Sequence, residues 1–165
     1  MRLPAHLSIF FATLAILFSG SLPAYSQSDP SGVWLTQAGD ARVQVNRCGA
    51  GICGRIVWLR DPIDPKTGKP QVDDKNQNPA LQQRPIMGLS IFVGMQPSGT
   101  GKWSGKIYNA DDGQTYTAHV TAQSTTTLEV QGCVGVLCGS ESWTRVSSAP
   151  AGAAVAKKNG ATPAN

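Results

Sequence analysis

Four cysteines occur as two matching pairs, Cys48 with Cys53 and Cys133 with Cys138, and four residues separate the members of each pair. Each pair lies between two runs of residues that favour β-strands, so each marks a tight hairpin turn. In an exported chain such cysteines form disulfides more often than zinc sites, whose cysteines are usually two residues apart. We therefore expect the disulfides Cys48–Cys53 and Cys133–Cys138, and neither a metal nor a cofactor.

The first 26 residues have the composition of a signal peptide. Arg2 precedes an apolar stretch, residues 9–18, that is too short to span a bilayer, and Ala24 and Ser26 place small residues before a cleavage site. Cleavage after Ser26 predicts a periplasmic or secreted protein. No later stretch approaches the ~20 apolar residues of a membrane helix, so we do not expect the mature chain to span a membrane.

Residues 147–165 consist mainly of small, polar and charged residues, and we expect this tail to be disordered. Residues 27–146 are then one domain. The net charge of +4 comes mostly from the two ends, because residues 27–146 contain 11 Lys or Arg and 10 Asp or Glu. A near-neutral domain without clusters of Lys and Arg argues against a nucleic-acid partner. The sequence does not identify a protein partner.

Short strand-like runs follow one another with turn residues between them, and no amphipathic helix interrupts them. Eight such runs predict an all-β fold, a small antiparallel up-and-down barrel. In this meander the two cysteine turns lie at opposite ends of the barrel. The runs cover residues 32–37, 42–47, 54–59, 89–93, 103–108, 115–122, 127–131 and 140–146.

One long segment, residues 61–87, interrupts the regular spacing of the strands. Asn78 is a suitable cap for a helical turn that begins at Pro79. The meander places this segment at the same end of the barrel as the Cys133–Cys138 turn. Loops of this length are usually functional or mobile, so we expect either a lid across the open end or a solvated crossover.

Candidate ligand-binding residues are aromatic and polar side chains on the strands and in the long segment. Eight-stranded barrels hold one small ligand, and apolar walls with a few polar groups are typical of such sites. Each aromatic residue, Phe92 and Trp103 included, has plain core packing as its alternative role. The candidates are Arg55, Trp58, Asp74, Asn76, Arg84, Tyr108 and Tyr116.

Catalytic residues are sparse. His119 is the single histidine after residue 26, and it lies on the threonine-rich face of its strand, where an exposed residue is favoured over a general base. The adjacent carboxylates Asp73 and Asp74, and Asp111 and Asp112, are typical of solvated turns. No serine lies in a nucleophile elbow. These observations favour a protein that is not an enzyme.

Two short motifs resemble the lipocalin and calycin signature: residues 32–34, Gly-Val-Trp, and residues 143–145, Trp-Thr-Arg. The resemblance implies that Trp34 packs against Arg145 where the barrel closes. The strand count agrees, because Trp34 begins the first strand and Arg145 ends the last one.

Longer motifs resemble a family of secreted bacterial proteins known as domain-of-unknown-function family 2147. They include Cys-Gly-Ala-Gly-Ile-Cys-Gly-Arg-Ile-Val-Trp-Leu at residues 48–59, and residues 84–89, 101–108 and 143–145. The resemblance covers nearly the whole domain and implies export and a calycin-like barrel, but no reaction. The chain departs from the expected pattern at residues 76–79, where it has Asn-Gln-Asn-Pro.

These observations lead to a binding protein for a small, partly apolar molecule that enters at the end of the long segment. Two alternatives stay open. The first is a structural or interaction module of the cell envelope without a ligand. The second is an enzyme that uses Asp74 and Arg84 of the long segment. An outer-membrane barrel is disfavoured because the outward strand positions are too polar for lipid.

Overall fold

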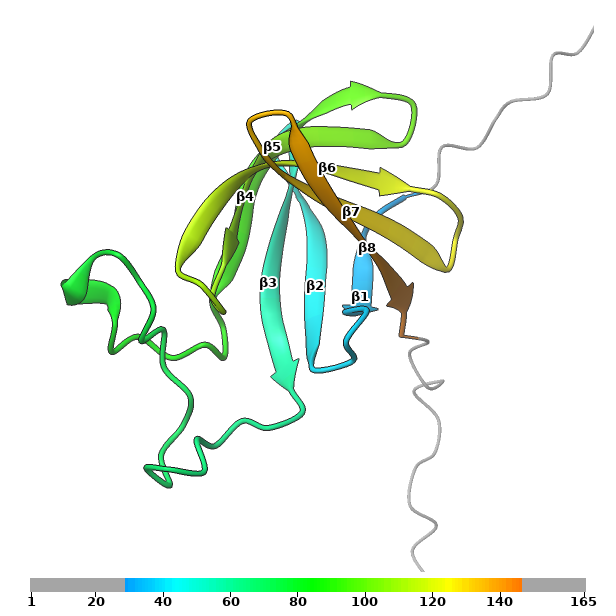
Figure 1. The fold of residues 1–165 in the computed structure, drawn as a ribbon. Coiled ribbons are helices and arrows are strands. Elements are labelled where there is room, and N and C mark those ends of the chain that lie inside the picture. The colour runs from blue at the N-terminus through cyan, green and yellow to red at the C-terminus, as the bar shows by residue number, and fades with distance from the viewer. Residues whose placement is uncertain (1–28, 147–165) are drawn as a thin grey trace, which may run out of the picture.

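The computed structural model describes residues 29–146, so the predicted signal peptide and tail lie outside the described residues. Eight antiparallel strands form a closed barrel in which the strands are neighbours in chain order (Figure 1). The predicted eight-stranded up-and-down barrel is therefore confirmed. The strands are β1 (Gly32–Leu35), β2 (Ala41–Cys48), β3 (Gly51–Leu59), β4 (Ser90–Gly99), β5 (Lys102–Asn109), β6 (Gln114–Ala122), β7 (Thr127–Val134) and β8 (Leu137–Arg145).

The barrel closes where β1 pairs with β8, with Trp34 opposite Arg145. The guanidinium carbon of Arg145 lies 4.2 Å from the centroid of the Trp34 ring, a cation–π arrangement. The indole Nε1 of Trp34 donates to the carbonyl of Pro30 at 2.8 Å, so the buried ring leaves no polar atom unpaired. A Cβ atom at Gly32 would collide with the Arg145 guanidinium, which explains why glycine precedes this tryptophan.

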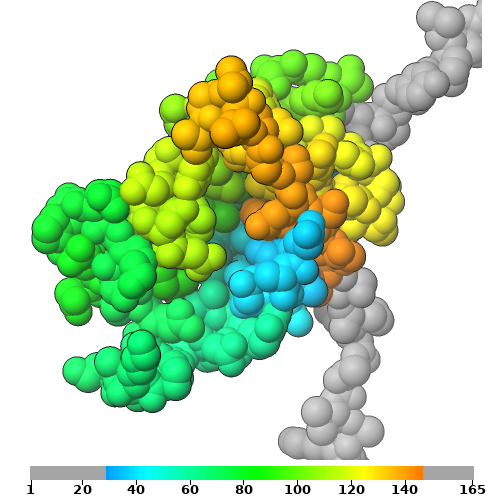
Figure 2. All heavy atoms as spheres, viewed as in Figure 1, coloured from blue at the N-terminus to red at the C-terminus, as the bar shows by residue number. Residues whose placement is uncertain are grey.

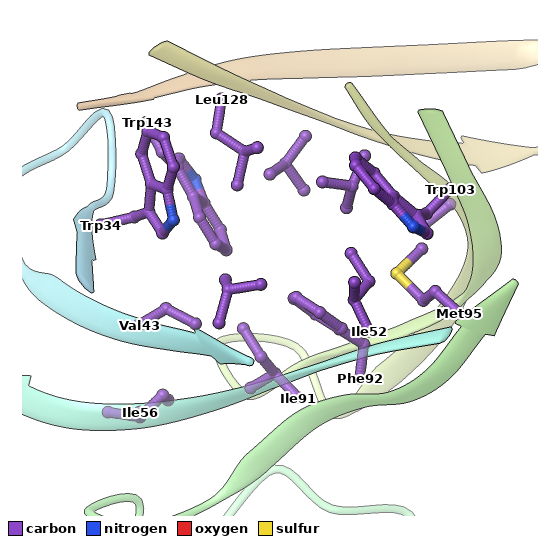
Figure 3. Close-up of a cluster of buried hydrophobic side chains, with 14 of the residues drawn as sticks. Trp34, Val43, Ile52, Ile56, Ile91, Phe92, Met95, Trp103, Leu128 and Trp143 are labelled. Atoms are coloured by element: carbon purple, nitrogen blue, oxygen red, sulfur yellow. The ribbon is translucent and has the colours of Figure 1, made fainter. Parts of the chain in front are cut away.

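The end of the barrel that contains the Cys48–Cys53 turn is filled by side chains. Inward positions alternate along each strand, as expected for a sheet with one buried face. Figure 3 shows Trp34 and Trp143 on one side of this cluster, and Trp103 and Met95 on the opposite side. Phe92 and Trp103 therefore belong to the core. The residues that are at most 2 % exposed include Trp34, Val45, Ile52, Phe92, Met95, Trp103, Ala118, Val120 and Leu128.

Both predicted disulfides are present, and they lie at opposite ends of the barrel. Cys48 and Cys53 join β2 to β3, and Cys133 and Cys138 join β7 to β8. The backbone N–H of Gly94 also donates to the Sγ of Cys53 at 3.2 Å, which connects this turn to β4. Each disulfide therefore holds a hairpin that is already defined by its strand pairing.

We expect the double substitution Cys48→Ala and Cys53→Ala to lower the free energy of unfolding by about 2 kcal/mol. The bridge closes a very short loop, so the unfolded chain gains little entropy when the bridge is lost. Urea denaturation under non-reducing conditions measures the change in the free energy of unfolding. The double variant Cys133→Ala and Cys138→Ala, which opens a loop of the same length, is the matched comparison. Peptide mapping that found a Cys48–Cys138 link would contradict the pairing.

The connection from β3 to β4, residues 60–89, is an ordered segment that we call the long loop. Its backbone folds back on itself through two isolated bridges, Ile63 with Pro70 and Val72 with Pro85. The predicted helical turn is present as a 3₁₀ helix, η1 (Pro79–Leu81), and the Oδ1 of Asn78 accepts from the backbone N–H of Ala80 at 3.1 Å. The loop projects to one side of the barrel (Figure 1).

The ladder between β4 and β5 covers only the filled end of the barrel. Pairing runs from Gly99 with Lys102 to Gln96 with Ser104 and stops there. The remainder of β5, up to Asn109, continues to pair with β6 on its other side. Toward the open end, β5 is instead joined to the long loop by side-chain contacts described below.

Candidate ligand-binding cavity

The other end of the barrel is hollow, with a cavity of about 1190 Å³. The turns that surround it are β1–β2, β5–β6 and β7–β8, and the long loop contributes part of the wall. Figure 2 shows these turns on one face of the molecule, with the long loop projecting beside them. The volume suits a small organic molecule.

The walls of this cavity are mainly aliphatic. They continue the inward face of the strands beyond the filled core, because the same alternation that buries the core directs these side chains inward. The apolar lining includes Val43, Ile56, Leu59, Ile86, Ile91, Ile107, Val130 and Trp143.

Three of the seven candidate binding residues line the cavity: Asp74, Tyr108 and Tyr116. Hydrogen bonding of the Tyr116 hydroxyl to the Oδ2 of Asp112, at 2.5 Å, raises the pKa of Tyr116 above its usual value. Burial, followed by the nearby Asp73 carboxylate, raises the pKa of Tyr108. Each hydroxyl donates a hydrogen bond to a carboxylate, which favours the neutral form of both phenols.

Trp58 lies outside the cavity, because a β-bulge changes the direction of its side chain. The β2–β3 ladder pairs Val43 with Ile56 but Arg42 with Trp58, so Val57 is an extra residue on β3. Trp58 then shares the outer face with Arg42, whose guanidinium lies 4.5 Å from the indole centroid. Strict alternation from Ile56 would have placed Trp58 inside the barrel.

Arg55 also lies outside the cavity, on the exposed face of β3. It pairs in the sheet with Gln44 on one side and Ser90 on the other. Its neighbour Ile56 occupies the inward position and lines the cavity. The alternation along β3 therefore directs the charged side chain toward solvent.

Asn76, Arg84 and Tyr108 surround a carboxylate that was not among the candidates, that of Asp73, whose side chain is 0 % exposed. Its Oδ1 accepts from the Tyr108 hydroxyl at 2.6 Å. Its Oδ2 accepts from Asn76 Nδ2 at 2.8 Å and from Arg84 Nε at 2.7 Å, and it forms an ion pair with Arg84 Nη2 at 2.7 Å. We call these four residues the Asp73 cluster. The cluster fastens the long loop to β5.

Asp74, the neighbour of Asp73, has a different environment. Its carboxylate is exposed and forms an ion pair with Lys75 at 3.5 Å. Arg84 binds Asp73, so Asp74 and Arg84, which the enzyme alternative combined, have separate partners. The sequence did not distinguish the two carboxylates. The bridge between Val72 and Pro85, a long-range pairing, sets Asp73 beside Arg84.

The long loop also packs closely against the β5–β6 turn. Gly113 has a φ of 71°, in the left-handed region, and a Cβ atom there would collide with the carbonyl oxygen of Lys75. Only glycine satisfies both conditions without strain. The turn and the loop therefore form one continuous part of the cavity wall.

Carboxylates predominate among the charged residues of the lining. Burial raises the pKa of Asp111, and repulsion from Asp40, Asp112 and Glu141 raises it further. These carboxylates belong to the β1–β2 turn, the β5–β6 turn and β8. The charged lining residues are Asp40, Asp61, Lys75, Asp74, Asp111 and Glu141.

His119 lies on the outer face of β6, away from the cavity. Its Nδ1 is 2.8 Å from the Oγ of Ser104, which also donates to the Oγ of Ser98 at 2.7 Å. Ser98 and His119 are exposed, Ser104 is half-buried, and none of the three lines the cavity. Within residues 29–146, no group of three His, Cys, Asp or Glu side chains is arranged to hold a metal ion.

A closed eight-stranded antiparallel barrel, filled at one end and hollow at the other, is a lipocalin-like fold. A solved structure has a similar fold: protein HP1028 from Helicobacter pylori, described as a member of the lipocalin family. It is 23% identical, has a TM-score of 0.60, and the match covers 72% of this chain and 84% of that chain. The chain belongs to the family described as uncharacterized proteins conserved in bacteria (DUF2147), whose model matches residues 32–145.

No curated protein matches the chain. In the part of the chain that the structure describes, no helix is long and apolar enough to cross a membrane. The two disulfides are typical of proteins outside the cytoplasm.

Proposed function

We propose that this chain is a periplasmic or secreted protein that binds a small, partly apolar molecule inside its barrel. The main support for this proposal is the cavity of about 1190 Å³, which has aliphatic walls and lies at one end of a barrel whose other end is filled. A barrel that needed only a stable core would gain by filling this volume as well, because empty apolar space costs stability. The predicted signal peptide and the two disulfides support export.

Two features of the wall support a ligand of mixed character. The deep part is lined by side chains such as Ile56, Ile107 and Val130, which favour an apolar body. The rim carries the hydroxyl of Tyr116 and several carboxylates, which suit a polar group at the entrance. Small-molecule sites typically combine these two kinds of surface.

A substitution at Gly132 tests the cavity directly. Gly132 lies in the lining on β7, and a Cβ atom there would be in ordinary contact with the Cβ of Tyr116, at 3.6 Å. Gly132→Phe should therefore place a phenyl ring in the cavity without a backbone clash. We expect the wild type to bind the uncharged fluorophore N-phenyl-1-naphthylamine, with an emission increase, and Gly132→Phe to weaken this binding about tenfold or more.

The matched control is Gln131→Phe, which adds the same ring at the next residue, on the opposite face of β7. This variant should bind the fluorophore as the wild type does. Equal binding by Gly132→Phe, with both variants folded by circular dichroism, would show that the probe binds elsewhere and would refute the proposal. Native mass spectrometry of protein purified from its own host would then identify a retained ligand as added mass.

A further inference from the structure

Positive and negative charges are distributed very differently between the cavity and the rest of the domain. Residues 29–146 contain 11 Lys or Arg and 10 Asp or Glu, so the domain as a whole is close to neutral. Five of those 10 carboxylates line the cavity, whereas only one of the 11 cationic residues, Lys75, does. A near-neutral domain therefore contains a strongly anionic cavity.

Three of these carboxylates, Asp40, Asp111 and Glu141, have no partner that neutralises them among residues 29–146. Asp40 accepts a hydrogen bond from the Thr36 hydroxyl at 2.6 Å, and Glu141 accepts one from the indole of Trp143 at 2.9 Å. Both donors are uncharged. Among the residues that the structure describes, none donates a hydrogen bond to the Asp111 carboxylate. The neighbouring carboxylates of Asp40, Asp112 and Glu141 repel it, which contributes to its raised pKa.

Two cationic side chains, Lys75 in the lining and Arg60 beside the first turn, have other partners. Lys75 pairs with Asp74 at 3.5 Å. Arg60 donates to the carbonyls of Ala38 and Gly39, on the first turn. No Lys or Arg side chain among residues 29–146 forms an ion pair with Asp40, Asp111 or Glu141.

We propose that the cavity selects a cationic amphiphile, a molecule with an apolar body and an ammonium or guanidinium group. This inference rests on the proposed function and names the chemical class of its ligand. The apolar body contacts the aliphatic wall formed by residues such as Ile56 and Val130, and the cationic group lies among Asp40, Asp111 and Glu141. A cation there relieves the repulsion between the carboxylates and is attracted by all of them.

Other classes of ligand fit these observations less well. An anionic amphiphile such as a fatty acid would bring a further negative charge to the rim. A neutral molecule would fill the aliphatic part but leave the carboxylates unpaired. A bare metal ion would make no use of the apolar walls, and no three potential ligands among residues 29–146 are arranged to hold one.

Three molecules with the same apolar chain test the inference: decyltrimethylammonium and decanoate, each below its micelle concentration, and decanol below its solubility limit. Each competes with N-phenyl-1-naphthylamine at low ionic strength. We expect decyltrimethylammonium to bind about tenfold more tightly than decanol, and decanoate to bind most weakly. Added sodium chloride should reduce the difference, since the rim is open to solvent.

The triple substitution Asp40→Asn, Asp111→Asn and Glu141→Gln should remove the difference between decyltrimethylammonium and decanol. Because it removes mutual repulsion and no ion pair, we expect this variant to fold, and the single Asp111→Asn variant should reduce the preference in part. Glu129→Gln, on β7 and outside the cavity, is the matched neutralising control and should retain the full preference.

The outcomes separate the two proposals. Equal binding of decyltrimethylammonium and decanol, or tightest binding of decanoate, would overturn the inference while the binding function stands. Unchanged cation preference in the triple variant would also overturn it. If neither the fluorophore nor decanol binds, the proposed function fails, and the inference fails with it.

Discussion

Trp34→Ala is expected to lower the free energy of unfolding by about 3–5 kcal/mol, the range typical of a buried aromatic side chain that is replaced by alanine. The Trp34 ring is 0 % exposed and packs where β1 meets β8. Its removal would leave a void in the filled end of the barrel. It would also remove the surface on which the Arg145 guanidinium lies, at 4.2 Å from the ring centroid.

Urea denaturation followed by far-ultraviolet circular dichroism measures this loss. Trp58→Ala is the matched control, because Trp58 also stacks with an arginine but lies on the outer face of β3. We expect the control to cost about 1 kcal/mol or less. Similar losses in the two variants would contradict the role assigned to Trp34. If Trp34→Ala does not fold, Trp34→Phe, which retains most of the buried area, should still lose about 1–2 kcal/mol.

Asp73→Ala is expected to have the second large effect, a loss of about 2–4 kcal/mol. The Asp73 carboxylate is fully buried, accepts one hydrogen bond each from Tyr108, Asn76 and Arg84, and forms an ion pair with Arg84. Its removal leaves these donors without their acceptor. The Arg84 side chain is 33% exposed, so water would partly solvate it, which places the expected loss below that of a fully buried ion pair.

The measurement combines urea denaturation with hydrogen exchange of the backbone. Because the Asp73 cluster joins the long loop to β5, amides such as those of Asp73, Asn76 and Ile86, which are bonded within the loop, should exchange faster in the variant. Asp74→Ala is the control: Asp74 is exposed and pairs only with Lys75, so we expect about 0.5 kcal/mol or less. Equal effects of the two substitutions would contradict the assignment of Asp73 as the anchoring residue.

The features predicted from sequence are those that local pattern determines. The predicted export and the spacing together indicated both hairpin disulfides, because four residues separate each pair and strands flank it. Turn residues and alternation gave the number of strands and the order of the barrel. Asn78 and Pro79 likewise indicated the helical turn in the long loop.

The features that sequence reasoning missed depend on contacts between distant residues. Trp58 was expected to line the cavity, but one extra residue, Val57, turns it outward, and the bulge exists only relative to β2. Asp73 was considered a solvated turn residue, because its burial requires Arg84 and Tyr108 to arrive from elsewhere. The acidic lining combines residues of separate turns, and no single stretch of the chain reveals it.

The contact between β1 and β8 has a consequence for how the chain folds. Seven of the eight strand pairings join strands that are consecutive in sequence, so each can form as soon as its two strands are available. The eighth joins Trp34 to Arg145, nearly the full length of the domain apart, and it carries the entropy cost of closing that loop. Until β8, which ends at Arg145, takes its place between β7 and β1, these two strands have unpaired edges that can pair with other chains. Truncation before β8 should therefore yield an aggregating ribbon and not a smaller barrel.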